Sequence, residues 1–230
     1  MNILLLETAT QICSVALERN GKLLTEIHSD EPNAHSSRLS VFIEQIFKET
    51  GLAMNTLDAV CVSSGPGSYT GLRIGVSSAK GICYALGKPL LAVPTMQNMA
   101  AYYFHLHPDY NGLVCPMIDA RRMECYTAIY SRDGVVKETT AEVIEAGIYD
   151  NWLNKSTVTF IGDGAEKTRQ LLSIHPNALY DTSFQISAAG MAELAEAKVQ
   201  KGEFEDVAYF EPFYLKDFVA KKSVVHGLHK

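Results

Sequence analysis

The sequence predicts an α/β protein made of two similar halves, each with a mixed sheet covered by helices. The first half reads as three meandering strands followed by helices that alternate with strands. The second half also opens with strands and closes with helices. Such an order is typical of a mixed sheet with helices packed on it. Two halves of this kind together indicate an actin-like (ribonuclease H-like) fold with two similar domains.

In the first half, hydrophobic periodicity and turn residues set the element boundaries. Asn20-Gly21 is a strong hairpin signal between two strands. Leu39, Phe42, Ile43, Ile46 and Phe47 form an apolar stripe at helical spacing, and Gly51 follows it as a helix stop. The expected elements are strands at 2–7, 12–19, 22–29, 58–63 and 90–93, helices at 35–50 and 70–86, and a third helix capped by Thr95.

In the second half, the same criteria predict a similar series of elements. These are strands at 113–118, 123–131, 134–140 and 157–161, and helices near 142–153, from 164 to about 174, and at 187–201, with a tail from 202. The polar segment 104–112 contains Pro108 and Gly112 and is the expected boundary. The expected domains are therefore residues 1–106 and 107–230.

Composition excludes several classes of protein. The 230 residues carry a net charge of −6, whereas a protein that binds nucleic acid on its own usually has a basic surplus. No apolar run reaches the roughly 18 residues of a membrane span, and the start is read as a buried strand instead of a signal peptide. The five cysteines stand singly in apolar stretches, which indicates small buried residues in a cytoplasmic protein.

A glycine-rich turn, SSGPGSYTG at 63–71, connects a strand to a helix. Such a turn can bind phosphate, but neither the P-loop spacing nor the dinucleotide-binding spacing is present. The alternative interpretation is a tight turn that lets helix 70–86 lie close to its neighbours. Gly71, Gly75 and Ala79 make one face of that helix nearly smooth, which indicates close packing against a helix of the same chain or of another subunit.

Candidate catalytic groups are sparse. His35 has Leu39 four residues later instead of a second histidine, so a metal held on this helix is not expected. An actin-like ATPase would place its phosphate-binding groups at two facing hairpins. The corresponding residues here are Glu7, Thr8 and Thr10 in the first half and Asp119, within IDARR, in the second, and neither hairpin contains glycine. The residues alone therefore favour a non-enzymatic actin-like module without cofactor or metal.

Four segments together resemble one known family. ETATQICSVAL, HSSRL, SSGPGSYTGLRIGVSSAKGICYALGKPLLAV and IDARRMECYTAIY are similar to the bacterial TsaB (YeaZ) family of tRNA threonylcarbamoyladenosine biosynthesis proteins. The resemblance implies an actin-like, two-domain cytoplasmic protein without catalytic activity of its own. It implies a heterodimer with the catalytic paralogue TsaD, joint action with the ATPase TsaE, contact with tRNA through the complex, and self-association when alone.

The resemblance also implies where the partner binds, namely on the two helices of the first domain. The expected interface residues are Leu39, Phe42, Ile46, Gly71, Gly75, Ser78, Ala79 and Ile82. Gly75→Leu is then expected to block the heterodimer while leaving the monomer folded. Lys216, Lys221 and Lys222 are interpreted as a solvated tail, with an auxiliary RNA contact as the alternative. Two other functions remain open, an independent actin-like ATPase and a metalloprotease of the glycoprotease superfamily.

Overall fold

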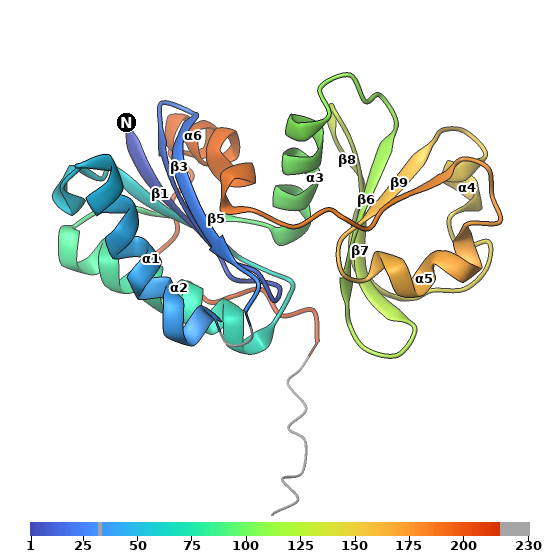
Figure 1. Ribbon diagram of the computed structural model, residues 1–230, viewed down its shortest axis with the longest axis horizontal. Helices are drawn as coiled ribbons and strands as arrows, with labels where there is room; N and C mark the ends of the chain where they lie inside the picture. The colour runs from blue at the N-terminus through green and yellow to red at the C-terminus, as the bar shows by residue number, and fades with distance from the viewer. Residues whose placement is uncertain (32–33, 217–230) are drawn as a thin grey trace, which may run out of the picture.

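The computed structural model describes residues 1–31 and 34–216 and has two halves, each built on a five-stranded mixed sheet (Figure 1). The first sheet contains β1 (Asn2–Glu7), β2 (Cys13–Arg19), β3 (Lys22–Ser29), β4 (Ala59–Ser63) and β5 (Leu90–Val93). The second contains β6 (Leu113–Asp119), β7 (Glu124–Ser131), β8 (Gly134–Val143), β9 (Val158–Ile161) and β10 (Ala178–Asp181).

Both sheets have the same topology. The strand order is β3-β2-β1-β4-β5 in the first and β8-β7-β6-β9-β10 in the second. In each, the first three strands form an antiparallel meander, and the last two strands run parallel to the first. This repeated order confirms the predicted doubled, actin-like α/β fold.

Helices cover both faces of the first sheet. The helices α1 (Ala34–Thr50) and α2 (Tyr69–Leu86) lie on one face, and α6 (Ala192–Lys201) lies on the other (Figure 1). Successive residues of a strand point to opposite faces. Accordingly, Leu4 and Leu6 of β1 join the core under α1 and α2, while Ile3 and Leu5 join the core under α6. The near-continuous apolar character of β1 thus reflects burial on both faces.

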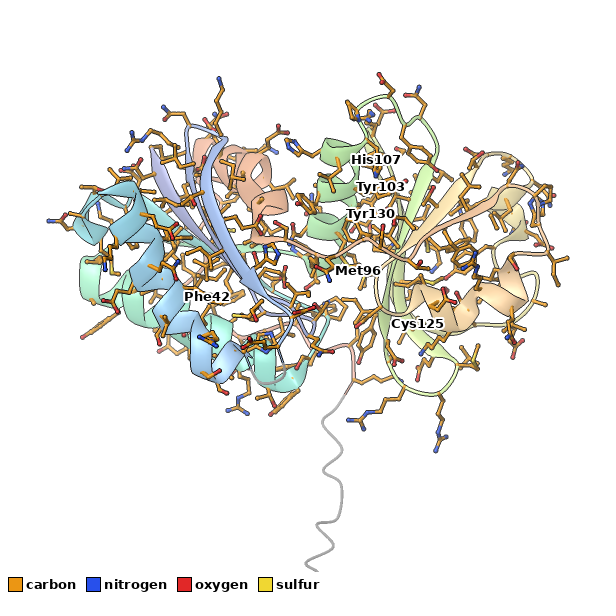
Figure 2. All side chains as sticks on the ribbon, viewed as in Figure 1. Phe42, Met96, Tyr103, His107, Cys125 and Tyr130 are labelled. Carbon is orange, nitrogen blue, oxygen red and sulfur yellow. The ribbon has the colours of Figure 1, made fainter. Side chains whose placement is uncertain are left out.

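The second sheet is covered in the same way. Its helix α3 (Thr95–Leu106) comes from the first half of the sequence and packs on β6 and β7, with Met96 and Tyr103 in one core with Tyr130 (Figure 2). The short helix α4 (Asp150–Leu153) and α5 (Ala165–Leu172) cover the opposite face. The last helices of the two halves, α3 and α6, therefore each pack on the sheet of the other half. A domain boundary between 106 and 107 stays a prediction.

Most predicted elements are confirmed within one or two residues, β8 continues three residues beyond the expected 134–140, and three other elements differ. The expected helix at 142–153 is only α4, because Glu142 and Val143 still pair with β7 and Gly147 has a left-handed φ of 82°. Thr95 does not cap α3: Pro94 is at that position, and the Thr95 hydroxyl bonds with Ser63 at 2.8 Å. The expected helix at 187–201 begins with a 3₁₀ turn, η2 (Ala188–Met191).

The strand β10 is not expected from the sequence, because it is a four-residue edge strand with no buried residue. All five cysteines are free and buried, as expected. Within the part of the chain that the structure describes, no helix has both the length and the apolar character needed to span a membrane.

Candidate functional site: the cleft and the outer helical face

A cleft of about 790 Å³ lies between the two halves. Four segments line it: residues 9–11 after β1, residues 66–70 before and at the start of α2, residues 118–122 at the β6–β7 hairpin, and residues 213–216 near the C-terminus. Of the four residues expected in a degenerate nucleotide cleft, Thr10 and Asp119 line this space, while Glu7 and Thr8 do not.

Glu7 is fully buried at the end of β1. Its Oε1 accepts a hydrogen bond of 2.7 Å from the Ala9 N–H, and its Oε2 accepts one of 2.7 Å from Asn98 Nδ2 on α3. Burial raises the pKa of Glu7 to about 7, because the ionised form loses its hydration. The carboxyl therefore belongs to a buried network between the halves and does not face Asp119 across the cleft.

Thr8 and Thr10 have different surroundings. Thr8 is buried, and its hydroxyl has no hydrogen-bond partner among the described residues. Thr10 is at the edge of the cleft, where its Oγ1 accepts a hydrogen bond of 3.2 Å from the Ile12 N–H. The hydroxyl of Thr10 therefore stabilises the loop after β1.

Asp119 is at the end of β6 and is held by basic neighbours. Its carboxylate pairs with Lys167 of α5 and accepts a hydrogen bond of 2.8 Å from the Arg121 N–H. Partial burial alone would raise the pKa of Asp119. The hydrogen bonds and positive charges of Lys167 and Arg121 outweigh this effect and hold that pKa below its usual value.

His35, in the first turn of α1, also lines the cleft. Its Nε2 is 3.1 Å from the carbonyl oxygen of Ile12, and burial lowers its pKa. Residues 1–31 and 34–216 contain no group of three His, Cys, Asp or Glu side chains arranged to hold a metal ion.

The glycine-rich turn lets α2 lie close to its neighbours, as one of the two interpretations of the sequence predicts. Ser68 caps α2 by accepting a hydrogen bond of 3.2 Å from the Gly71 N–H. A Cβ on Gly71 would collide with the backbone oxygen of Thr8, and one on Gly75 would collide with the Thr8 hydroxyl. The smooth face of α2 therefore packs against the end of β1 in its own chain.

This packing changes the surface that a partner can reach. Of the expected interface residues, six are buried in the first half: Leu39, Phe42, Ile46, Gly71, Gly75 and Ala79. Figure 2 shows Phe42 between the helices and the sheet. Only Ser78 and Ile82 are partly exposed. Gly75→Leu is accordingly expected to disrupt the monomer itself, which corrects the earlier expectation.

A different strip of α2 is exposed in part, most of all at Gly81 and Ala85. It consists of Ile74, Ser78, Gly81 and Ala85, one to three turns apart on the helix, and we call it the outer face. The outer face carries no charge. Among the residues that the structure describes, no atom lies within 4 Å of a Cβ placed on Gly81, so packing among these residues does not account for this glycine. On α1, Val41 is exposed to 47%.

Residues 203–216, which we call the strap, return from α6 across the first half to the cleft. Glu205 bridges to Leu90, Lys80 of α2 donates to the carbonyls of Ala208 and Phe210 at 3.0 Å, and the Phe213 N–H donates to Ser64 at 2.7 Å. Lys216 pairs with Glu124 of the second half, so this part of the predicted solvated tail is bound. Lys221 and Lys222 lie outside the described residues.

Sequence reasoning missed three contributors to these sites. Asn98 Nδ2 donates hydrogen bonds to Glu7 Oε2 at 2.7 Å and to the carbonyl oxygen of Ser187 at 3.0 Å. The sequence signal for this role is an asparagine within an apolar helical stretch. Lys167 is 48 residues from Asp119, and nothing in the sequence indicates their pairing. The strap contacts likewise depend on tertiary structure alone.

Comparison with known proteins identifies the family. The family model described as "TsaD: tRNA N6-adenosine threonylcarbamoyltransferase" matches residues 30–228. The tRNA threonylcarbamoyladenosine biosynthesis protein TsaB of Escherichia coli is 30% identical over 232 residues, which cover 97% of this chain and 98% of that protein. The chain belongs to this family and, within it, to the TsaB proteins.

Solved structures agree with this assignment. YeaZ from Pseudomonas aeruginosa superposes with a TM-score of 0.80 at 27% identity, covering 93% of this chain and 99% of that one. A 2-hydroxyisocaproyl-CoA dehydratase activator from Clostridium difficile, at 10% identity and a TM-score of 0.53, shares the fold alone. The resemblance of the four sequence segments to the TsaB family is thus confirmed, and with it the involvement in tRNA threonylcarbamoyladenosine biosynthesis.

Proposed function

We propose that this chain is a non-catalytic subunit that docks and activates a TsaD-type catalytic subunit, together with a TsaE-type ATPase, in the cytoplasm. The supporting comparison is twofold: its relatives are named for the threonylcarbamoyladenosine pathway, and the matching family model is that of the transferase itself. In this proposal the partner transfers threonylcarbamoyl to the tRNA adenosine beside the anticodon, and tRNA reaches this chain through the complex.

The observation that carries the docking proposal is Gly81 on the outer face. A glycine inside a helix costs about 1 kcal/mol relative to alanine. Gly71 and Gly75 compensate by packing on Thr8, but within residues 1–31 and 34–216 no atom lies within 4 Å of a Cβ placed on Gly81. Close approach of a helix from another subunit accounts for Gly81, because small residues allow two backbones to come together. The same strip would serve self-association when the partner is absent.

The two carboxyls that the sequence places in a nucleotide cleft support a non-catalytic role. An actin-like ATPase needs carboxylates that are available to a metal and phosphates. Here Glu7 is turned into the interior and bonded to Ala9 and Asn98, and Asp119 is paired with Lys167. Both carboxyls therefore already have structural partners.

The docking proposal is tested by mixing the chain with its TsaD-type partner and analysing the mixture by size-exclusion chromatography. Gly81→Leu places a side chain on the outer face and is expected to abolish the complex peak while the variant itself stays folded. Gln170→Leu, at an exposed position of α5, adds the same side chain elsewhere and is expected to leave the complex unchanged. An undiminished complex with Gly81→Leu would refute the assignment of the outer face.

A further inference from the structure

The hairpin between β6 and β7 carries two arginines where the backbone favours other residues. Arg121 and Arg122 have φ angles of 74° and 52°, in the left-handed region that side chains with a Cβ rarely adopt. The β2–β3 hairpin has nearly the same angles, 53° and 74°, at Asn20 and Gly21, the residues that suit them best. Backbone geometry therefore does not account for the two arginines, which strain the hairpin.

Both side chains are exposed and line the cleft. Among the residues that the structure describes, neither guanidinium has a hydrogen bond or an ion pair, although the charge of Arg121 lowers the pKa of Asp119. Of the acids that line the cleft, Asp119 is paired with Lys167 and Glu124 with Lys216, while Asp163 accepts a hydrogen bond of 2.9 Å from the Asp119 N–H. The hairpin therefore presents two cationic groups whose charge no carboxylate neutralises at contact distance.

The opposite wall of the cleft also favours a negatively charged ligand. Ser68 and Thr70, at the N-terminus of the 18-residue helix α2, line it. Helix N-termini carry unsatisfied N–H groups and a partial positive charge, which favour anions. A guanidinium presents its donors in a planar fork that fits phosphate oxygens. Strained backbone conformations cluster at ligand sites, where they lower the stability of the fold and hold functional residues in place.

We propose that Arg121 and Arg122 bind the phosphate groups of a ligand at the mouth of the cleft. Two sources carry this chemistry, the phosphodiester backbone of an RNA and a nucleoside triphosphate. The RNA source rests on the proposed function, which brings tRNA to the complex. Because the chain as a whole is acidic, binding at this site is local to the hairpin and does not follow from net charge.

The test measures binding of tRNA and, separately, of ATP to the full chain over a series of salt concentrations. The variant Arg121→Asn/Arg122→Gly installs the residues that the backbone prefers and removes both charges. Lys155→Gln/Lys201→Gln removes two exposed charges that do not line the cleft and is the matched control. The arginine variant is expected to bind the true ligand at least about tenfold more weakly, with a salt slope for RNA lower by about one per lost contact.

The same variant is expected to melt about 2–4 °C higher than the unaltered chain, since it relieves the hairpin. Loss in the tRNA arm identifies RNA as the source, and loss in the ATP arm identifies a nucleotide. Binding of both ligands equal to that of the lysine control overturns the proposal, and so does a lower melting temperature. Failure here leaves the docking proposal standing, because no residue of the outer face is changed.

Discussion

At the scale of single residues, the glycines of α2 have different functions although they look alike in the sequence. Gly71 and Gly75 are required because Thr8 occupies the space that a side chain would need. Gly81 has open space beside it. The sequence predicted a smooth helical face, but the neighbour that uses it is a strand end, and only the tertiary structure shows this.

This difference predicts opposite effects of the same substitution. Gly71→Ala drives a methyl group into the backbone oxygen of Thr8 and is expected to lower the free energy of unfolding by about 2 kcal/mol. Gly81→Ala removes the conformational cost of glycine and is expected to raise it by about 1 kcal/mol. Urea unfolding of the two variants measures both effects. Equal changes in the two variants would contradict the assigned packing.

Glu7 predicts a pH dependence of stability. Burial raises its pKa to about 7, from 4.5 for an ordinary glutamate. The stability that protonated Glu7 contributes is therefore fully present below about pH 4.5 and is lost as the pH rises through about 7. Between these values the free energy of unfolding is expected to fall with pH, by at most about 1.4 kcal/mol per pH unit for this group.

The variant Glu7→Gln isolates this contribution. Burial also raises the pKa of Glu18 to about 7. Glu18 therefore contributes to the pH dependence of the free energy of unfolding in both proteins. Urea unfolding of the two proteins from about pH 5 to pH 8 is expected to show a shallower fall for the variant. Identical slopes would mean that Glu7 has the same pKa in the folded and unfolded protein, which would contradict the raised pKa.

At the scale of elements, the strap explains how the C-terminal part of the chain joins the cleft. Its contacts with α2 depend largely on Lys80, which donates to two carbonyl oxygens of the strap. The ring of Tyr214 also lies 4.9 Å from that of Tyr69, at the start of α2. The sequence predicted only a tail here, because the segment has neither helical nor strand periodicity and its partners in α2 and in the second half are more than 90 residues away.

Removal of the Lys80 ammonium is therefore expected to loosen the strap. A hydrogen bond from a charged donor contributes about 1.5–3 kcal/mol. In Lys80→Met, the amide of Phe213 is expected to exchange with solvent at least about tenfold faster, as measured by hydrogen-exchange mass spectrometry. Lys88→Met, just beyond the end of α2, is the control and is expected to change nothing. Unaltered exchange in Lys80→Met would show that the strap is held by its other contacts.

At the scale of the whole molecule, the sequence predicted the doubled fold well because its signals are local. Asn20-Gly21, Gly51 and Gly87 each have the left-handed backbone that their types suggest, and each ends or turns an element. The candidate site was less predictable. Glu7 and Asp119 are both strand-end carboxyls in the sequence, yet one is buried beside Asn98 and the other faces the cleft.

The whole fold is also compatible with the proposed role as a docking subunit. The helices α1 and α2 pack on the first sheet, and the buried residues of these helices fix the position of the outer face. Among the described residues of the cleft, the side chains of Asp119 and Glu124 are paired with lysines, whereas those of Arg121 and Arg122 form no hydrogen bond or ion pair. In this account the chain acts through its surfaces, with the outer face as the essential one.

The most direct measurement is the threonylcarbamoyladenosine content of tRNA, determined by mass spectrometry of nucleosides, in host cells that carry Gly81→Leu in place of the unaltered chain. We predict that the modified nucleoside falls to the level found in cells lacking the chain, whereas Gln170→Leu retains it. Normal modification in cells with a stably folded Gly81→Leu chain would contradict the account.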